Sequence, residues 1–502
     1  MLEPDSPPTL LLSRRTRRHA VLFGLGGRAL VVMGIYLLVA IVVTASLSSL
    51  TVAGLAALVG LGLYAAVRQP LSIERDPWGV RLVQTWRLRQ ATRTGVDAFR
   101  PSQHTPVPRP VGDILILGVA RTQDSPEQVL IRHSTSARGV YFSATIEIEG
   151  RGDGLRPTSA ARRDDAALER ALNTLAEDRS PIDELSLMTR AMPGLPDAYK
   201  ERVRAMRDPS LDATMLGDNI EQRMANVGAV SDKYRMFATL SMPEEALHRW
   251  AARRLGATDR DAISQAAYSQ LGLVAELLNT AGFRVVQGLG PRRFGALVRH
   301  LYMPSRSMDD LSGIAVAHDG FPSYPRPLYD ALQVPDWRHD VLWYHATGTI
   351  APSGWPAGRV TSRWMLPAVG QMFDVAGPSA IRTVTSTWRL LSRRESQREM
   401  ADQILNTMTQ VVRDQGRVTT GEDQEQVDLG HQVMSDLRHQ SSGVLPSVRV
   451  TCSAPSALGI MEARGLVDSS MSDMNVDAFR WHDGRQADAM VLSLPLGRGL
   501  AR

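Results

Sequence analysis

The 502-residue sequence has a single cysteine, Cys452, and only two lysines, Lys200 and Lys233. One cysteine excludes a disulfide within the chain and also the cysteine-rich zinc patterns. Because Cys452 lies in the alternating apolar stretch SVRVTCS, we expect a buried, unreactive thiol. Most of the positive charge is arginine, and a net charge of +5 is too small to indicate nucleic-acid binding by itself.

The sequence contains no phosphate-binding loop of the form G-x-x-x-x-G-K-[ST], since neither lysine follows a glycine-rich loop. The nearest pattern is GLGPRRFG at residues 288–295, between an expected strand and an expected helix. Its third-glycine spacing does not fit a dinucleotide site, and no acidic residue at the end of a strand follows about 20 positions later. We expect a tight turn there, with Pro291 opening a helix and Arg292 and Arg293 in its first turn.

The common catalytic and metal-binding motifs are also absent. Neither G-x-S-x-G nor H-E-x-x-H occurs. The tripeptide HDG occurs twice, starting at His318 and at His482, and Asp-Gly indicates a turn. His339 and His345 are six residues apart, which does not place them on one helix face. We therefore predict no catalytic residue, no metal ligand and no cofactor, and we expect that the chain is not an enzyme.

Charged residues and histidine are absent from residues 29–67. One helix of that length would measure about 58 Å, whereas the apolar layer of a bilayer is about 30 Å thick. We predict a transmembrane hairpin at 28–68, with helices at about 29–46 and 51–67 in the lipid bilayer. Arginines flank it on both sides, so both chain ends are expected in the cytoplasm and the protein in the cytoplasmic (cell) membrane. Residues 1–27 would be a basic cytoplasmic segment.

The rest of the sequence alternates strand and helix patterns, which predicts an α+β fold. We expect a small β-rich module at 71–150, including a strand at 79–89. A mostly helical connector is expected at 151–230. Two α+β domains of ferredoxin-like or split type would follow at 231–380 and 381–502.

Several residues mark where individual elements begin and end. Gly282 ends an amphipathic helix that starts at Ala262, and Ser392 and Glu395 have the spacing of a capping box. A further polar helix is expected at about 422–440. The last apolar run, ADAMVLSL, predicts a strand that leads into the turn PLGRG.

Aromatic residues gather between residues 337 and 388: Trp337, Trp343, Tyr344, Trp355, Trp364 and Trp388. Packing in a core is the ordinary role of aromatic residues on strands. A protein-interaction surface is the alternative, because tryptophan and arginine are frequent interface anchors. Base stacking would need a denser set of basic residues beside them.

Several of these segments resemble the N-terminal domain of TraC/CagE-like conjugation ATPases. The segment ADAMVLSLPLGRGL resembles the end of that domain, which leads into the nucleotide-binding domain, and IRTVTSTWRLLSRRESQREM resembles its strand and long helix. A third segment, LLNTAGFRVVQGLGPRRFGALVRHLYMP, carries the resemblance through Gly282, Phe283, Val285, Leu289, Leu297, Arg299, Tyr302 and Pro304. The N-terminal hairpin resembles PrgI-like membrane proteins of conjugative elements.

Together these features resemble actinobacterial two-span proteins that are encoded apart from the ATPase. The resemblance implies a non-catalytic, membrane-anchored scaffold or assembly subunit of a conjugative DNA-transfer, type IV-like secretion machine. The partners it implies are a separate conjugation-type ATPase, other membrane subunits and further copies of the chain, with no direct nucleic-acid binding. We expect residues 491–502 to lie near the surface that meets the ATPase.

Two other functions stay open. Two-span membrane proteins also include EccE-like structural subunits of type VII secretion, which would accompany an FtsK-like EccC ATPase. A membrane-tethered enzyme with an unrecognised site is the other alternative, and it would need a deep polar pocket with clustered ionisable groups. The identity of the ATPase that co-purifies from membranes separates the two scaffold hypotheses.

Overall fold

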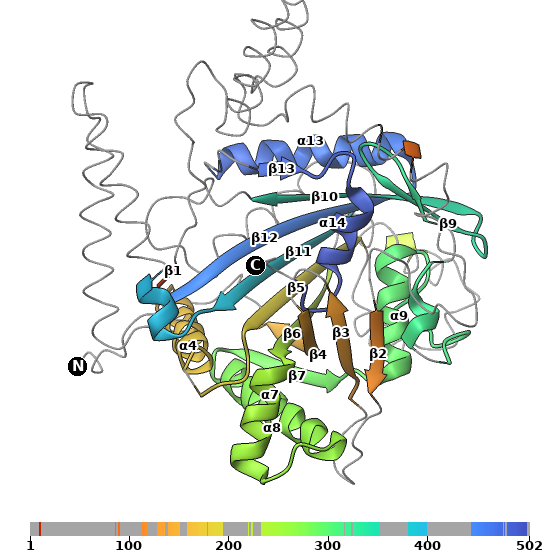
Figure 1. The fold of residues 1–502 in the computed structure, drawn as a ribbon. Helices are drawn as coiled ribbons and strands as arrows, with labels where there is room; N and C mark the ends of the chain where they lie inside the picture. The colour runs from red at the N-terminus through yellow and green to blue at the C-terminus, as the bar shows by residue number, and fades with distance from the viewer. Residues whose placement is uncertain are drawn as a thin grey trace, which may run out of the picture.

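The structure is a computed structural model with a large, mainly antiparallel sheet and helices packed on both sides of it (Figure 1). It describes residues 10–11, 86, 89–90, 113–117, 128–135, 139–150, 158–177, 179–193, 219, 222–223, 232–315, 317–322, 325–350, 380–398, 443–474, 476 and 479–498. The predicted mixture of helices and strands is confirmed. The predicted transmembrane hairpin at 28–68 lies outside these residues. Within them, no helix has the length and apolar character needed to cross a membrane.

The first part of the described chain forms a unit that we call the first unit. Its elements are β2 (Asp113–Leu117), β3 (Leu130–Thr135), β4 (Gly139–Gly150), α4 (Thr158–Leu175), β5 (Glu184–Pro193), β6 (Asp232–Pro243), α7 (Glu244–Leu255), α8 (Arg260–Thr280), β7 (Phe283–Gly288) and α9 (Pro291–Tyr302). The strands pair in the order β2-β3-β4-β6-β5, and every pairing is antiparallel. Strand β7 pairs with the later half of β4, on the same side as β3.

The later part forms the second unit, after the short 3-10 helix η2 (Ala317–Gly320). Its elements are β8 (Arg326–Pro327), β9 (Leu332–Asp336), β10 (Val341–Ile350), β11 (Ile381–Leu390), β12 (Gly443–Ala454), α13 (Ala457–Asp473), β13 (Phe479–Trp481) and α14 (Gln486–Ser493). The strands pair in the order β8-β9-β10-β12-β11, again antiparallel, and β13 pairs with the later half of β10. Near the N-terminus, β1 (Leu10–Leu11) lies parallel to β12.

The second unit repeats the strand arrangement of the first. In both units a hairpin leads into a long strand, which pairs with that hairpin, with the second strand that follows it in the chain and with a short last strand. The units join where β5 pairs with β11 in antiparallel direction. Counted from the outer edge of the sheet, β2-β3-β4-β6-β5 of the first unit therefore corresponds to β8-β9-β10-β12-β11 of the second. This one sheet contains strands from both sides of residues 230 and 380. The domain boundaries expected at those two positions stay a prediction.

The two faces of the sheet have different coverings, because successive side chains of a strand point to opposite faces. Face A is the apolar face, which α4, α7 and α8 cover in the first unit and α13 covers in the second (Figure 1). Face B is covered by α9, by α14 and by the residues that follow α14. The apolar core accordingly lies in layers on both sides of one sheet.

Most of the predicted boundaries are confirmed by their local hydrogen bonds. Asp259 caps α8 by accepting from the amide of Ala262 at 2.8 Å, and Gly282 follows the helix with a φ of +90°. In the capping box, the Glu395 amide donates to Ser392 Oγ at 3.3 Å and the Ser392 amide donates to Glu395 Oε2 at 3.1 Å. The helix expected at 422–440 lies outside the described residues.

Two expectations about secondary structure were wrong. The run ADAMVLSL is the helix α14, because a short apolar run fits a buried helix as well as a strand. Of the strand expected at 79–89, Trp86 and Arg89 are described and both are helical. The mostly helical connector expected at 151–230 stays a prediction; it contains α4 and also the strand β5, which is central in the sheet. Its sequence, ELSLMTRAMP, alternates only in part, since both faces of the strand are covered.

Candidate functional site

The centre of face B carries a band of hydroxyl side chains that are buried. It consists of Ser143, Thr145, Ser186, Thr239, Ser241, Thr347, Thr383, Thr385, Thr387, Ser447, Thr451 and Ser453. Three cross-strand pairs, Thr145–Thr239, Ser186–Thr387 and Thr347–Thr451, are each hydrogen-bonded at 2.9 Å between the hydroxyl oxygens. Hydroxyl-rich strand faces are usually solvated, so a covered one requires polar partners above it.

The segment that follows α14 supplies part of this covering. Thr145 Oγ1 donates to the carbonyl oxygen of Pro495 at 3.1 Å, and the Tyr141 hydroxyl donates to that of Leu496 at 3.4 Å. Leu494 and Leu496 are 3% and 0% exposed and belong to the apolar cluster on face B. The segment thus runs from the second unit onto β4 of the first. The expectation that residues 491–502 lie near a surface that meets an ATPase stays a prediction, and 499–502 lie outside the described residues.

Gly497 is the position where this segment comes closest to the sheet. Its φ is +62°, in the left-handed region that favours glycine. A Cβ atom at this position would lie 3.0 Å from the Cβ of Ser241 and 3.4 Å from that of Ser143. Both the backbone conformation and the space therefore require glycine.

Buried basic side chains connect α9 to the strands beneath it. Arg190 on β5 is fully buried and donates to Thr383 Oγ1 at 2.7 Å and to the carbonyl oxygen of His300 at 3.2 Å. Burial lowers the pKa of Arg190 to about 9. His345 on β10 is also buried, and burial lowers its pKa to about 3. Its Nε2 lies 2.8 Å from the carbonyl oxygen of Tyr302, which can only accept, so His345 is neutral with the proton on Nε2.

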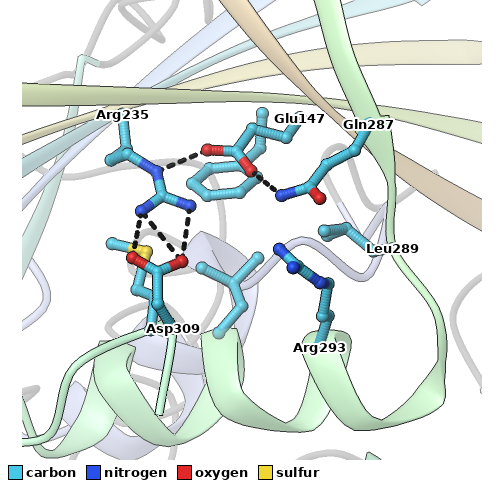
Figure 2. A pocket seen from close by; sticks show the side chains of 9 residues that line it. Glu147, Arg235, Gln287, Leu289, Arg293 and Asp309 are labelled. Carbon is cyan, nitrogen blue, oxygen red and sulfur yellow. Dashed lines mark hydrogen bonds and ion pairs between the residues drawn. The ribbon is translucent and has the colours of Figure 1, made fainter. Parts of the chain in front are cut away.

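A small polar pocket lies beside α9, lined by residues of β4, β6, β7 and the loop after α9 (Figure 2). Arg235 forms ion pairs with Glu147 and with Asp309, the second at 3.1 Å, and Gln287 Nε2 donates to Glu147 at 2.7 Å. Burial alone would lower the pKa of Arg235, but these two carboxylates raise it above its ordinary value. Arg293 in the first turn of α9 points toward the same space (Figure 2).

The chemistry of this pocket is that of a structural ion-pair network. Its free space, about 10 Å³, is enough for roughly one water molecule. Glu147 and Asp309 both accept from Arg235, so neither carboxylate is a free general base. The pocket therefore connects the loop after α9 to the sheet.

A second polar cluster surrounds Asp336 at the tip of the β9–β10 hairpin. The Asp336 side chain is fully buried and accepts from Arg306 at 2.8 Å, from His339 Nδ1 at 2.8 Å and from Ser305. Burial would raise the pKa of Asp336, but these hydrogen bonds hold it well below its ordinary value. Ser305 also accepts from the indole of Trp343 at 3.1 Å. The tip of the hairpin is therefore held in one conformation.

The candidate residues named from the sequence do not come together in one site among the described residues. The 288–295 turn ends β7 and opens α9 with Pro291, as predicted, and both HDG tripeptides are in turns or a 3-10 turn. Cys452 is buried in β12, and burial raises its thiol pKa to about 12. His339 and His345 are not brought together, and the described part of the chain contains no group of three or more side chains able to hold a metal ion.

The aromatic residues differ in their burial. Trp343 is buried, while Tyr344 and Trp388 pack partly against the core of face A. Trp337, in contrast, is 74% exposed at the tip of the β9–β10 hairpin. Trp355 and Trp364 lie outside the described residues.

Comparisons with known proteins identify no family for this chain. No protein-family description matches the sequence, and no curated protein is similar to it.

Proposed function

We propose that the chain is a non-catalytic, membrane-anchored scaffold subunit of a conjugative, type IV-like transfer machine. In this proposal the hairpin at 28–68 holds the protein in the cytoplasmic membrane, and the large sheet docks a separate ATPase. Other membrane subunits and further copies of the chain complete the assembly. ATP hydrolysis is a property of the partner.

The observation that carries the proposal is the packing of the segments that resemble the conjugation ATPases. The segment from α8 through α9 ends at Tyr302, and the segment from α14 to residue 498 begins at Gln486, so 183 residues separate them in the sequence. Leu297 of the first and Met490 and Leu496 of the second nevertheless belong to one buried cluster on face B. This is what is expected if the segments come from one ancestral domain rather than from chance similarity of short motifs.

The topology gives further support. The elements β4, α4, β5, β6, α8 and β7, with strand order β7-β4-β6-β5, have the arrangement of a ferredoxin-like domain built from two split β-α-β units. Strands β10 to β13, in the order β13-β10-β12-β11, follow the same order. We therefore propose that the chain contains two ferredoxin-like domains joined through β5 and β11. A rigid double domain of this kind suits a scaffold.

The identity of the ATPase tests the proposal. The tagged full-length chain is extracted with detergent from the membranes of its native host, and co-purifying proteins are identified by mass spectrometry. A tagged, unrelated two-span protein from the same membranes is the control. Specific enrichment of a conjugation-type ATPase supports the proposal, whereas an FtsK-like EccC ATPase supports a type VII subunit. Enrichment of neither contradicts a scaffold role in both machines.

A further inference from the structure

The two units differ in how face A of their first hairpin is covered. In the first unit, α7 lies over the β3–β4 hairpin. Its Leu247 and Ala251 are fully buried, in the same cluster as Phe142, which is 2% exposed. At its N-terminus, Glu244 Oε1 lies 2.8 Å from Arg132 Nε on β3. The covering of this hairpin is therefore an amphipathic helix with an acidic first turn.

In the second unit, nothing among the described residues corresponds to α7. Strand β12 ends at Ala454, and α13 begins at Ala457. Because Leu342 pairs with Pro335 and Tyr344 pairs with Gln333, these four side chains lie on face A. Leu342 is 44% exposed, and the other three are half-buried. Among the described residues, no helix lies over this surface of the second unit as α7 lies over that of the first.

The tip of the exposed hairpin is anchored by polar contacts. Asp336, held by Arg306, Ser305 and His339, immediately precedes Trp337. Asp340 completes the turn with a φ of +52°. Trp337, which is 74% exposed, thus directly follows an anchored position of the hairpin. An exposed tryptophan on a preorganised loop is typical of an interface anchor.

The charge on this surface matches that of the covered hairpin. Arg326 on β8 pairs with Gln333 and therefore lies on face A, where it is exposed. Among the described residues, no carboxylate forms an ion pair with it. In the first unit, the cation at the edge of the hairpin, Arg132, is paired with the acidic first turn of α7. An acidic helix terminus is thus the complementary group for Arg326.

We propose that face A of the β8–β9–β10 surface, with Trp337 at its tip, docks an amphipathic helix of a partner protein. The helix lies as α7 lies on the first unit, with its apolar side on Leu342 and Pro335 and its acidic first turn near Arg326. The inference goes beyond the proposed function, since it identifies the surface and the form of the partner and holds for a partner in either secretion machine.

Photo-crosslinking of the full-length chain in the membranes of its native host tests this inference. The probe is p-benzoylphenylalanine in place of Leu342, and the matched control carries it in place of Val286, which is 47% exposed on β7 of the first unit. The expected result is an adduct at position 342, absent at 286, with a second protein at a segment of helical apolar periodicity. Arg326→Glu and Trp337→Ala each reduce that adduct by about fivefold or more.

Both substitutions affect exposed side chains, so unchanged thermal unfolding of the two variants excludes misfolding as the cause. Mixing heavy-isotope and normal chains distinguishes a second copy from a different protein. Adducts only within the chain, adducts only between heavy and normal chains, or no adduct at position 342 overturn the inference. An adduct that neither substitution reduces overturns it as well. These results do not depend on which ATPase co-purifies, so the two proposals fail separately.

Discussion

Thr145 on β4 donates its hydroxyl hydrogen to the carbonyl oxygen of Pro495 at 3.1 Å, although 350 residues separate them in the chain. Because Thr145 has one hydroxyl hydrogen, Thr239 is the donor in the 2.9 Å contact between their two side chains. The residues after α14 are therefore part of the core of the first unit. The two units are joined at β5–β11 and again by this segment.

Replacing Gly497 with alanine tests how closely this segment packs. Gly497→Ala places a Cβ at a φ of +62° and 3.0 Å from the Cβ of Ser241. The backbone conformation costs about 1 kcal/mol, and the close contact adds about 1–3 kcal/mol. Urea or thermal unfolding of the purified full-length chain measures the loss.

Gly256→Ala is the matched control. Gly256 has a φ of +69°, and its added Cβ would meet no atom within 4 Å. The control therefore carries the backbone cost without the contact. Equal destabilisation by the two substitutions would show that residue 497 does not pack on the sheet.

Shortening a leucine of the same segment tests whether it belongs to the core. Leu496→Ala should cost about 2–5 kcal/mol of unfolding free energy, because the side chain is fully buried. Leu458→Ala on α13, where the leucine is 66% exposed, should change stability by less than about 0.5 kcal/mol. Similar values for both would contradict the burial of Leu496.

His345 gives the fold a dependence on pH. Its pKa is lowered by burial to about 3 in the folded protein, against 6.5 for an ordinary histidine. Between these values only the unfolded chain takes up the proton, so acidification favours unfolding. The wild type should lose up to about 1.4 kcal/mol per pH unit from this group as the pH falls from 6.5 to 4.5.

His345→Gln removes the titrating ring and keeps a polar side chain. Its free energy of unfolding should be lower than that of the wild type at pH 7, and the difference should shrink as the pH falls. Denaturant unfolding at several pH values measures both curves. A difference that stays constant between pH 7 and pH 4.5 would contradict a neutral, buried His345.

Asp336→Asn tests the anchor of the β9–β10 hairpin. The substitution leaves Arg306 without its carboxylate in a largely buried place, which should cost about 3 kcal/mol. Asp340→Asn is the control, because Asp340 is exposed and asparagine tolerates its positive φ. Thermal unfolding should separate the two variants. Equal unfolding temperatures would indicate that the Asp336 cluster does not hold the hairpin.

Local signals in the sequence predict the boundaries of the elements well. Pro291, Gly282 and the Ser392–Glu395 capping box act through neighbouring backbone groups, so the chemistry of a few residues is sufficient. The pairing of β5 with β11 is different, because it depends on long-range contacts between strands with no shared motif. The similarity of the two units therefore follows from the strand order in the structure and not from a motif in the sequence.

The burial of individual side chains was harder to predict for the same reason. The strand IRTVTSTWRL places Thr383, Thr385 and Thr387 on one face, a pattern typical of a solvated surface. That face is buried by elements more than eighty residues away in the chain, including α9 and α14. Trp337 and Trp343 likewise look equivalent in the sequence, and the hairpin pairing decides that only the first is exposed.

The central claim is that the sheet docks a separate conjugation-type ATPase, and crosslinking mass spectrometry of the detergent-extracted complex tests it most directly. We predict crosslinks between that ATPase and residues beyond 230, including the surface around Trp337. A complex in which no ATPase crosslinks to any residue beyond 230 would contradict the claim.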